Sequence, residues 1–580
     1  MTAAPPGKRR RPPRQSESGK RPPPRGMGPA VVDLYRSTLG QALTGSLLLA
    51  AALPPLDLWP LAWIAPVWWV LLIRRRELPG RRPYRSIWLA GFVFWMLAYH
   101  WLRLPHWATS FGWIALAFYL SFYLPVFIGL SRVAVHRLRI PVMVAAPVVW
   151  TGLELARAHL LSGITMASLG HTQYRWLAMI QVSDLAGAFA VSFLVMFAAA
   201  CLARWIPWEG RPRADGMIVV LVLVVAANLF YGYRRLNRAA PPPQLNVALI
   251  QGSIDVTLQD DPARSDRIWR DYLRLSRAAT QQAARNRAPL DLIVWPETML
   301  PKPIAPLITY EPGAGVPADW DYSPEEFRRW LPEGAAASRW RVGHVAVVLG
   351  TPMIVGLDRA HLAGSRVEFF NSAAYLSARG DVLGTYDKNH LVMFGEYVPW
   401  ADRFPWLRRL TPLPGGLTAG HGAAAFEVHG LRLAPHICYE SVLSHLIRGQ
   451  VNELARQGRE PDVLVNLTND GWFWGSSELD MHLVCGVFRA VECRKPFLIA
   501  ANTGFSAWID TDGRIRTRLH RRSEDVVFAE VGRESRTSWY LVHGDWAAGI
   551  CLAFCGLAAM IGVWDHLAAR RRRIDPPQGH

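Results

Sequence analysis

The sequence predicts a polytopic α-helical membrane domain of about eight spans, joined to an α/β domain that lies outside the membrane. Of its 580 residues, 51% are hydrophobic and only 19% are charged, and 26 are Trp. This balance is typical of a membrane protein that carries a globular domain. Apolar segments long enough to cross a bilayer fill the N-terminal part, and one more lies near the C-terminus. Between them, short apolar runs alternate with helical stretches.

The membrane domain is expected to contain seven spans within residues 38–233 and an eighth at residues 543–564. Arginines are concentrated after the second, fourth, sixth and eighth spans, whereas the loops after the first and third are nearly free of cations. Cationic loops remain in the cytoplasm, so both termini are expected there and the α/β domain on the other side, with Tyr233-Arg234-Arg235 as an exception. The predicted spans are residues 38–55, 57–73, 86–104, 108–131, 141–160, 178–204, 216–233 and 543–564.

Both ends of the chain are basic. Residues 1–30 are rich in Pro and Arg and have nothing to build a core from, which predicts a disordered cytoplasmic tail. Residues 565–580 include four consecutive arginines and form a second basic cytoplasmic tail. The formal charge of +19 therefore does not indicate nucleic-acid binding, because no basic and aromatic platform accompanies the tails. The N-terminal basic region is too long for a signal peptide, so we expect it to be retained.

The α/β domain is expected at residues 244–535, after the linker Pro241-Pro242-Pro243. Helical stretches at Ser265–Arg285 and Met481–Arg494 separate short apolar runs, an alternation typical of α/β domains. Residues 298–343 are rich in Pro, Gly and aromatics, which predicts a long loop or lid. The predicted strands are Leu245–Ile250, Leu290–Val294, His344–Leu349, Glu368–Leu376, Leu431–Ile437, Asp462–Leu467 and Phe497–Ala501.

Three side chains of complementary chemistry lie beside strand-like runs of this domain, namely Glu297, Lys388 and Cys438. A thiol attacks acyl carbonyls well only as the thiolate, so it needs a base, and a fixed cation can hold the oxyanion that forms. Cys438 lies where a predicted strand meets a predicted helix, a turn that exposes a nucleophile and offers backbone N–H groups. Taken singly, each has an ordinary interpretation: a buried cysteine, a surface glutamate and a solvated turn lysine.

The segments around these residues resemble the nitrilase (carbon–nitrogen hydrolase) superfamily. They read WPE at residues 295–297, DKNHLVMFGEYVP at 387–399 and ICYES at 437–441. Together with the flanking spans, the chain is similar to the apolipoprotein N-acyltransferases, a membrane-embedded family. Trp150, Glu154 and Arg157 match that family's W-x3-E-x2-R pattern. The chain departs from the family at residues 164–166 and at Met393, where lipid substrates would be bound.

The resemblance implies an αββα sandwich and a two-step acyl transfer without metal or organic cofactor. Cys438 would take a fatty acyl chain from a membrane phospholipid as a thioester. The α-amino group of a diacylglyceryl-cysteine at the N-terminus of an apolipoprotein would then attack, giving an amide. The implied location is the bacterial cytoplasmic (inner) membrane, with the catalytic domain on the periplasmic side. The expected partners are the phospholipid, the apolipoprotein and the bilayer, and not nucleic acid.

Further residues are expected to support this chemistry. Glu396 resembles a second glutamate that the superfamily keeps near the lysine, with structural hydrogen bonding as its alternative role. The backbone N–H of Tyr439 is expected to help hold the oxyanion. Tyr439 and Glu440 are both expected to shape the pocket. The residues expected to contact lipid are Trp295, Phe394, Trp472, Trp474, Glu154 and Arg157. The alternatives are core packing for the aromatics and mutual pairing for Glu154 and Arg157, which lie one helical turn apart.

Two other functions remain open on the sequence. One is a membrane-anchored amidase or nitrilase that hydrolyses a C–N bond with the same three residues and water. The other is a transporter or scaffold whose α/β domain only binds partners, although such a domain has no need of Glu297, Lys388 and Cys438 together. No metal site is expected, because His390, His436 and His482 match no zinc-ligand spacing.

Overall fold

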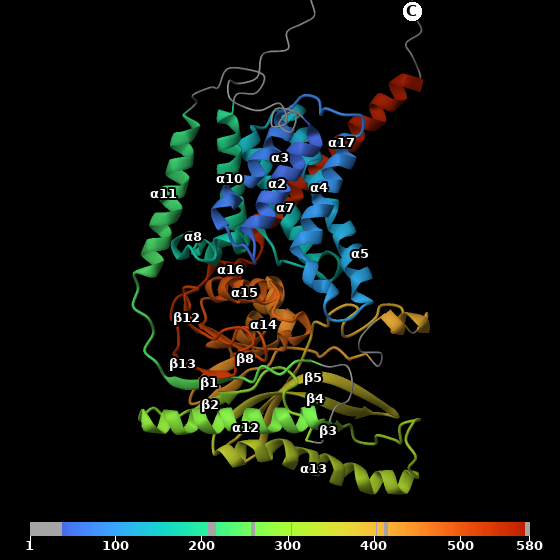
Figure 1. The fold of residues 1–580 in the computed structure, drawn as a ribbon, viewed down its shortest axis with the longest axis vertical. Coiled ribbons are helices and arrows are strands. Elements are labelled where there is room, and N and C mark those ends of the chain that lie inside the picture. Colours follow the sequence, from blue (N-terminus) through green and yellow to red (C-terminus); the bar gives the residue numbers. More distant parts are fainter. Residues whose placement is uncertain are drawn as a thin grey trace, which may run out of the picture.

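The computed structural model consists of a helical bundle and an α/β domain, drawn above and below in Figure 1. The chain builds the bundle as far as α11 (Met217–Leu236), then forms the α/β domain, and returns to the bundle with α17 (Trp546–Ile574). The structure describes residues 37–206, 216–256, 262–302, 304–401, 403–410 and 416–574. The predicted tail at residues 1–30 and the end of the predicted C-terminal tail, residues 575–580, lie outside these ranges.

Nine helices longer than eight residues build the described part of the bundle, and short helices lie between several of them. The long helices are α2 (Thr38–Ala52), α3 (Ala65–Arg74), α4 (Pro83–Ala98), α5 (Thr109–Ser121), α6 (Tyr123–His136), α7 (Val142–His159), α10 (Ala188–Trp205), α11 and α17. The short ones include α8 (Leu177–Ile180), α9 (Ser183–Ala186) and α16 (Trp539–His543), together with η4 (Leu169–Gln173).

A helix occupies each of the eight ranges predicted to span a membrane, but the helices differ in length. Within the described ranges, four are long and apolar enough to cross a bilayer. Others are shorter, such as α2 with 15 residues and α4 with 16. The four that suffice by length and composition are Thr109–His136, Ala188–Trp205, Met217–Leu236 and Trp546–Ala568.

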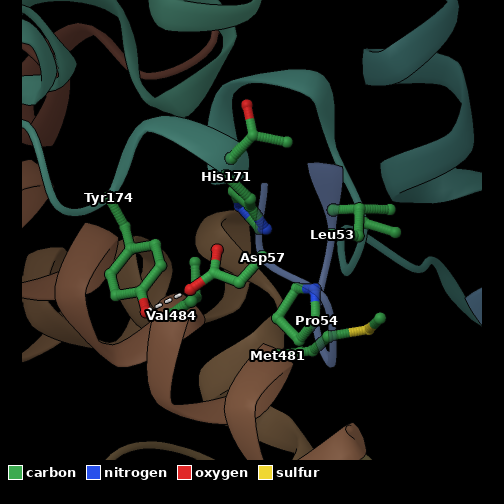
Figure 2. A pocket seen from close by; sticks show the side chains of 9 residues that line it. Leu53, Pro54, Asp57, His171, Tyr174, Met481 and Val484 are labelled. Atoms are coloured by element: carbon green, nitrogen blue, oxygen red, sulfur yellow. Dashed lines mark hydrogen bonds between the residues drawn. The ribbon is translucent and has the colours of Figure 1, made fainter. Parts of the chain in front are cut away.

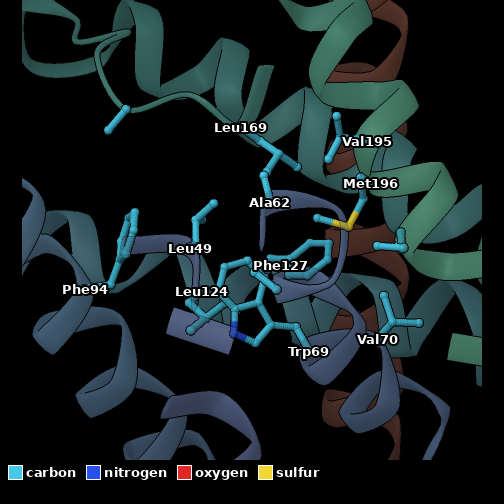
Figure 3. Close-up of a cluster of buried hydrophobic side chains, with 14 of the residues drawn as sticks. Leu49, Ala62, Trp69, Val70, Phe94, Leu124, Phe127, Leu169, Val195 and Met196 are labelled. Carbon is cyan, nitrogen blue, oxygen red and sulfur yellow. The ribbon is translucent and has the colours of Figure 1, made fainter. Parts of the chain in front are cut away.

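Large apolar side chains from several helices fill the centre of the bundle (Figure 3). Trp69 of α3 stacks on Trp150 of α7 with ring centroids 5.4 Å apart, and Phe127 of α6 meets Trp150 edge-on at 5.1 Å. Such aromatic pairs add to the energy of burial. Where backbones touch, only glycine fits, since a Cβ on Gly152 of α7 would lie 2.7 Å from the carbonyl group of Cys551 on α17.

Two β-sheets form the centre of the α/β domain. The strand order of one sheet is β13-β1-β2-β4-β5-β6 with β3 beside β4, and that of the other is β12-β11-β10-β9-β8-β7. The first sheet contains β1 (Leu245–Gln251), β2 (Leu292–Val294), β3 (Leu307–Tyr310), β4 (Met353–Ala363), β5 (Arg366–Leu376), β6 (Val382–Asp387) and β13 (Asp525–Val531). The second contains β7 (Phe426–Val428), β8 (Leu431–Ile437), β9 (Val463–Thr468), β10 (Phe497–Ala501), β11 (Ala507–Ile509) and β12 (Ile515–Arg518).

Helices cover the outer face of each sheet, so the expected αββα sandwich is confirmed. The helices α12 (Pro262–Arg285) and α13 (Pro324–Leu349) pack on the first sheet, and α14 (Ser444–Arg456) and α15 (Glu478–Cys493) on the second. In Figure 1 the α14–α15 layer faces the bundle and the α12–α13 layer faces away from it.

Burial on both faces explains why the strands read as continuous apolar runs. In β1, Val247 and Leu249 point into the core between the sheets, whereas Ala248 and Ile250 pack against the outer helices. Side chains alternate between the two faces of a strand, so every position of such a strand is apolar. The predicted bounds of β8 and β10 agree with the structure.

Two predictions for residues 298–349 were wrong. The expected strand His344–Leu349 is the last turns of α13, and the expected loop at residues 298–343 contains β3 and most of that helix. The helix begins with a capping box of Ser323 and Glu326 and ends at Gly350, whose φ is +60°. Pro332 lies inside the helix, and a proline in the sequence usually indicates that a helix ends. The β-branched residues at the C-terminal end of the helix are typical of a strand.

We expect Gly152→Ala to destabilise the bundle, because the new methyl group would collide with the backbone of α17. Overpacking of this kind costs about 1–3 kcal/mol, which thermal unfolding in detergent would detect as a lowered midpoint. Gly556→Ala on α17 is the matched control, since a Cβ there has nothing within 4 Å. Equal midpoints for the two variants would contradict this account of the α7–α17 contact.

Candidate active site

Cys438 lies in a sharp turn between β8 and the short helix η6 (Cys438–Val442). Its φ is +51°, a left-handed conformation that is strained for a residue with a Cβ and is found at functional turns. The side chain is partly exposed, unlike those of the other five cysteines, which are buried. The strand-to-helix turn predicted for this residue is therefore confirmed in form, and it fixes the backbone of Cys438.

Glu297 and Lys388 come together from different strands of the first sheet. Glu297 lies three residues after the end of β2, and Lys388 directly follows β6. The Lys388 Nζ atom is 3.5 Å from Oε1 of Glu297 and 2.8 Å from Oε1 of Glu396. Lys388 is 1% exposed and Glu297 6%. The structure thus places Glu396 beside the lysine, as expected from the sequence.

Hydrogen bonds fix the two carboxylates around the lysine. Asn371 of β5 donates from Nδ2 to Oε1 of Glu297 at 2.7 Å and to Oε1 of Glu396 at 3.3 Å. The backbone N–H of Asn469, just after β9, donates to Oε2 of Glu297 at 2.8 Å. Three strands of the first sheet and one strand of the second therefore contribute to one buried polar cluster.

The surroundings of the cluster raise the pKa of both Cys438 and Lys388. Burial raises the pKa of the Cys438 thiol well above its usual value, Glu297 raises it further, and Lys388 opposes them. Burial alone would lower the pKa of Lys388, but the carboxylates of Glu396 and Glu297 outweigh it and raise the pKa. At neutral pH the sulfur is therefore a protonated thiol that needs a base, and Lys388 remains an ammonium.

Glu440 connects the lysine segment with the cysteine turn rather than lining the pocket. Its carboxylate accepts hydrogen bonds from the backbone N–H groups of Ile437 and Asn389, both at 2.7 Å, and of His390 at 3.1 Å. The Tyr386 hydroxyl donates to both carboxylate oxygens at 2.8 and 2.9 Å. Glu440 is fully buried. A single carboxylate thus holds the segments that carry Lys388 and Cys438 next to each other.

A loop of the helical bundle supports the cysteine turn from the other side. Tyr439 donates from its hydroxyl to the carbonyl of Gly163 at 2.8 Å, and Thr165 donates to the carbonyl of Val442 at 2.5 Å. Gly163 has φ +77°, and a Cβ there would overlap the carbonyl of Ala158. The turn that carries Cys438 is therefore built jointly by the bundle and the α/β domain.

Two family models match the chain over most of its length. The model described as apolipoprotein N-acyltransferase N-terminal domain matches residues 45–201, and the carbon–nitrogen hydrolase model matches residues 246–540. The apolipoprotein N-acyltransferase of Rhodopirellula baltica is 32% identical over 560 residues, which cover 90% of this chain and 96% of that protein. That of Geobacter metallireducens is 34% identical over 550 residues, covering 92% and 95%. The chain belongs to the apolipoprotein N-acyltransferase family.

Membership of this family of N-acyltransferases makes the protein an enzyme, and it agrees with the resemblance seen in the sequence. The relatives match along both the bundle and the α/β domain, so the likeness is not confined to the hydrolase-like part. The names of the relatives state N-acylation of apolipoproteins. They leave open which side chains of this chain act and how.

Three of the residues expected to contact lipid have other partners in this N-acyltransferase. Trp295 is fully buried beneath the first sheet and donates from Nε1 to Ser276 at 2.9 Å, so lipid contact by this side chain is excluded. Glu154 and Arg157 do not pair with each other. Glu154 accepts from the backbone N–H of Leu169 at 2.9 Å, and Arg157 donates to the carbonyl of Met166 at 2.9 Å.

These two bonds hold the ends of the bundle loop that supports Tyr439, and both charged side chains are buried, at 5% and 4% exposure. Both side chains therefore bind the backbone of the loop at residues 163–169. The other three side chains that are expected to contact lipid are at least partly exposed. Phe394 is 38% exposed and Trp474 55%, and Trp472 is partly exposed.

A small cavity lies where the bundle meets α15 (Figure 2). Tyr174 of the bundle donates to Asp57 at 3.2 Å beside it, and Met481 and Val484 of α15 close it from the other side. Its volume of about 10 Å³ is enough for about one water molecule. The cavity is thus a packing gap at the junction and not a substrate site.

Sequence reasoning missed a second buried polar group, close behind Cys438. His482 of α15 lies with Asp470 and Glu478, and one ligand-type atom from each falls within 4.8 Å of the other two. The spacing of His482 in the sequence matches no zinc-ligand pattern and gives no other signal. Its partners lie 12 and 4 residues away, on η7 (Asp470–Phe473) and on its own helix, so only the fold brings the three together.

We expect Glu440→Gln to lower both thermal stability and N-acylation of a diacylated lipopeptide. All partners of the carboxylate are donors, so the amide NH₂ of glutamine would face an N–H group, and an unsatisfied buried donor costs about 1–3 kcal/mol. Glu427→Gln on β7, where the side chain is exposed, is the control. An unchanged unfolding midpoint in Glu440→Gln would show that this carboxylate does not hold the two segments together.

Proposed function

We propose that this enzyme transfers a fatty acyl chain from a membrane phospholipid, through a thioester on Cys438, to the α-amino group of an apolipoprotein's N-terminal diacylglyceryl-cysteine. Glu297, Lys388 and Cys438 are the proposed catalytic residues. The observation that carries the proposal is the buried Lys388–Glu297–Glu396 cluster beside a strained, partly exposed cysteine. The family adds the direction of the reaction, since its members are named N-acyltransferases of apolipoproteins.

In the first step, Glu297 takes the proton of the Cys438 thiol as the sulfur attacks the ester carbonyl of the phospholipid. The tetrahedral oxyanion is held by the Lys388 ammonium and the backbone N–H of Tyr439, in the way that fixed donors stabilise developing charge. When the intermediate collapses, the C–O bond breaks and the leaving alkoxide receives the proton from Glu297. The products are the acyl thioester and a lysophospholipid.

In the second step, the α-amino group of the diacylglyceryl-cysteine attacks the thioester carbonyl. Glu297 accepts a proton from the amine, and the same donors hold the oxyanion. The C–S bond breaks, the thiolate of Cys438 takes the proton, and the amide product leaves. Glu396 is proposed to orient Lys388 during both steps, because its Oε1 atom is the nearer partner of the ammonium.

We further propose eight spans in the bacterial cytoplasmic membrane, with both termini in the cytoplasm and the α/β domain on the periplasmic side. The arginine-rich helix ends support this topology. Arg137, after α6, pairs with Asp565 of α17 at 2.6 Å, and Arg132 donates to the carbonyl of Arg76 at 2.9 Å. The C-terminal end of α17 lies at the end of the bundle opposite the α/β domain (Figure 1). A cluster of cations at one end is what the positive-inside rule requires.

The exposed aromatics Phe394, Trp472 and Trp474 are proposed to contact the acyl chains at the entrance to the site. They follow Lys388 and β9, the two segments that carry the polar cluster. Aromatic side chains suit the boundary between lipid and water. No metal or organic cofactor is part of the proposed chemistry, since thiol, base and cation suffice for both acyl transfers.

Mass spectrometry of the enzyme purified in phospholipid-containing micelles tests the thioester. We expect a fatty acyl adduct on Cys438 that neutral hydroxylamine removes and that disappears when a diacylated lipopeptide is added. Cys438→Ala should lack the adduct, whereas Cys493→Ala, which removes a buried thiol of α15, should keep it. Absence of any adduct on the native enzyme would refute the thioester route, and release of free acid from simple amides would favour an amidase.

We expect Glu297→Gln to slow adduct formation by about 10²–10⁴-fold, the usual contribution of a general base. Glutamine keeps the shape of the side chain but turns an NH₂ group toward the donors Asn371 and Asn469, so the unfolding midpoint should fall as well, and the rates are compared on folded enzyme. Glu311→Gln, at an exposed position, is the control for loss of one carboxylate. Single-turnover acylation followed by mass spectrometry measures the rate, and a native rate in Glu297→Gln would assign the base to another group.

A further inference from the structure

The ring of His482 lies directly behind the nucleophile, between an anion and the backbone carbonyl of Cys438. Its Nδ1 atom is 3.2 Å from Oδ1 of Asp470, and its Nε2 atom is 3.1 Å from the carbonyl oxygen of Cys438. Nε2 is also 2.8 Å from the hydroxyl oxygen of Ser441. The side chain is 4% exposed. Both ring nitrogens therefore have protein atoms as their hydrogen-bond partners.

The neighbours determine which atoms carry protons. A carboxylate and a carbonyl oxygen can only accept, so the contacts with Asp470 and Cys438 both require an N–H on the ring. The Ser441 hydroxyl donates its one proton to the Cys438 carbonyl at 3.1 Å and therefore also presents a lone pair to His482. Asn466 donates from Nδ2 to the Ser441 hydroxyl at 3.3 Å and also lies 3.4 Å from Nε2. An unprotonated Nε2 would thus gain this one long contact but would face the oxygens of Cys438 and Ser441 at 3.1 and 2.8 Å. The hydrogen-bonding pattern fits an imidazolium with both nitrogens protonated.

We propose that His482 is a positioning residue whose protonated ring binds the Cys438 carbonyl and strengthens the Tyr439 N–H as an oxyanion donor. This inference rests on the proposed acyl transfer. The Cys438 carbonyl and the Tyr439 N–H belong to the same peptide unit, in which resonance links the two groups. A charged donor on the oxygen draws electron density from the nitrogen, so the N–H becomes more polar, as in cooperative hydrogen-bond chains. The same bond holds the strained φ of Cys438.

Charges around the ring support its protonation. Burial alone would lower the pKa of His482, but Asp470, Glu478 and the Cys438 carbonyl outweigh it and raise the pKa to about 9. The charged groups that face the ring are Asp470 from η7 and Glu478 from its own helix, with Oε1 of Glu478 3.9 Å from Nδ1. Burial and the nearby Asp470 raise the pKa of Glu478 well above its usual value, and the charge of His482 opposes this shift.

Protonation has a consequence for pH dependence. An unperturbed histidine loses its proton near pH 6.5, whereas His482 would keep it until about pH 9. The contribution of the charged ring is therefore fully present at neutral pH and is lost as the pH rises through 9. The rate of Cys438 acylation should follow the same course above neutral pH.

Single-turnover acylation of the full-length enzyme by phospholipid, followed from pH 7 to 10, tests the role in catalysis. We expect His482→Gln, which keeps a neutral N–H donor, to slow acylation by about tenfold to a hundredfold, less than loss of an oxyanion donor. It should leave KM for phospholipid unchanged and remove the decline near pH 9. His482→Leu, without a donor, should be slower still. A native rate and pH profile in His482→Gln would overturn the proposal.

Protonation itself can be observed without activity. Nitrogen-15 NMR of histidine-labelled enzyme in lipid nanodiscs, with the His482 signals assigned by their loss in His482→Gln, should show two protonated ring nitrogens at pH 8. His436 provides the internal reference, because burial lowers its pKa to about 4 and the ring is neutral. A singly protonated His482 would overturn the proposal, as would an unprotonated Nδ1 together with one bound divalent cation per chain by elemental analysis.

The two experiments separate this inference from the proposed function. An enzyme without a Cys438 thioester but with a doubly protonated His482 would refute the acyl-transfer route, and the ring would then only fix the turn. A normal thioester with a neutral His482 would leave the transfer mechanism intact and refute the role given to the imidazolium.

Discussion

The constraint on which the site depends is the burial of one ammonium group. A charge taken out of water costs several kcal/mol unless it is paired and hydrogen-bonded. Lys388 meets this condition through Glu396 and Glu297, and the excess negative charge of the two carboxylates is taken up by Asn371 and by the backbone N–H of Asn469. Segments after β2, β6 and β9 are therefore fixed by a single set of charges, and the strand ends cannot shift independently.

A second consequence concerns the way the bundle takes part in the chemistry. Glu154 and Arg157 are buried in α7 and bind the backbone of the loop that follows it. That loop accepts the hydroxyl of Tyr439, and Thr165 in it donates to the end of η6. Glu154 and Arg157 thus connect, through this loop, to the turn that carries Cys438. In this enzyme the membrane helices are part of the active-site framework and not only an anchor.

The sequence predicted the three central residues and most strands because each strand is buried on both faces and leaves a continuous apolar run beside a polar residue. It failed where the same local pattern fits two structures. The run ending at Leu349 reads as a strand, but the capping box at Ser323 starts a helix that includes it. The partners of Trp295 and His482 come from other elements, and neither spacing nor composition contains that information. Contacts with other elements of the fold determine the structure at these positions.

Buried ion pairs hold the junction between the bundle and the α/β domain. Asp184 of α9 accepts from Arg494, which caps α15, and from Arg235 of α11, both at 2.6 Å. Arg494 is fully buried. Buried ion pairs of this kind add little net free energy but enforce one geometry, because removal of one partner leaves an uncompensated charge. These ion pairs therefore fix the α/β domain on the bundle. In the proposed thioester route, the thiol of Cys438 would then meet donor and acceptor in turn at one fixed place.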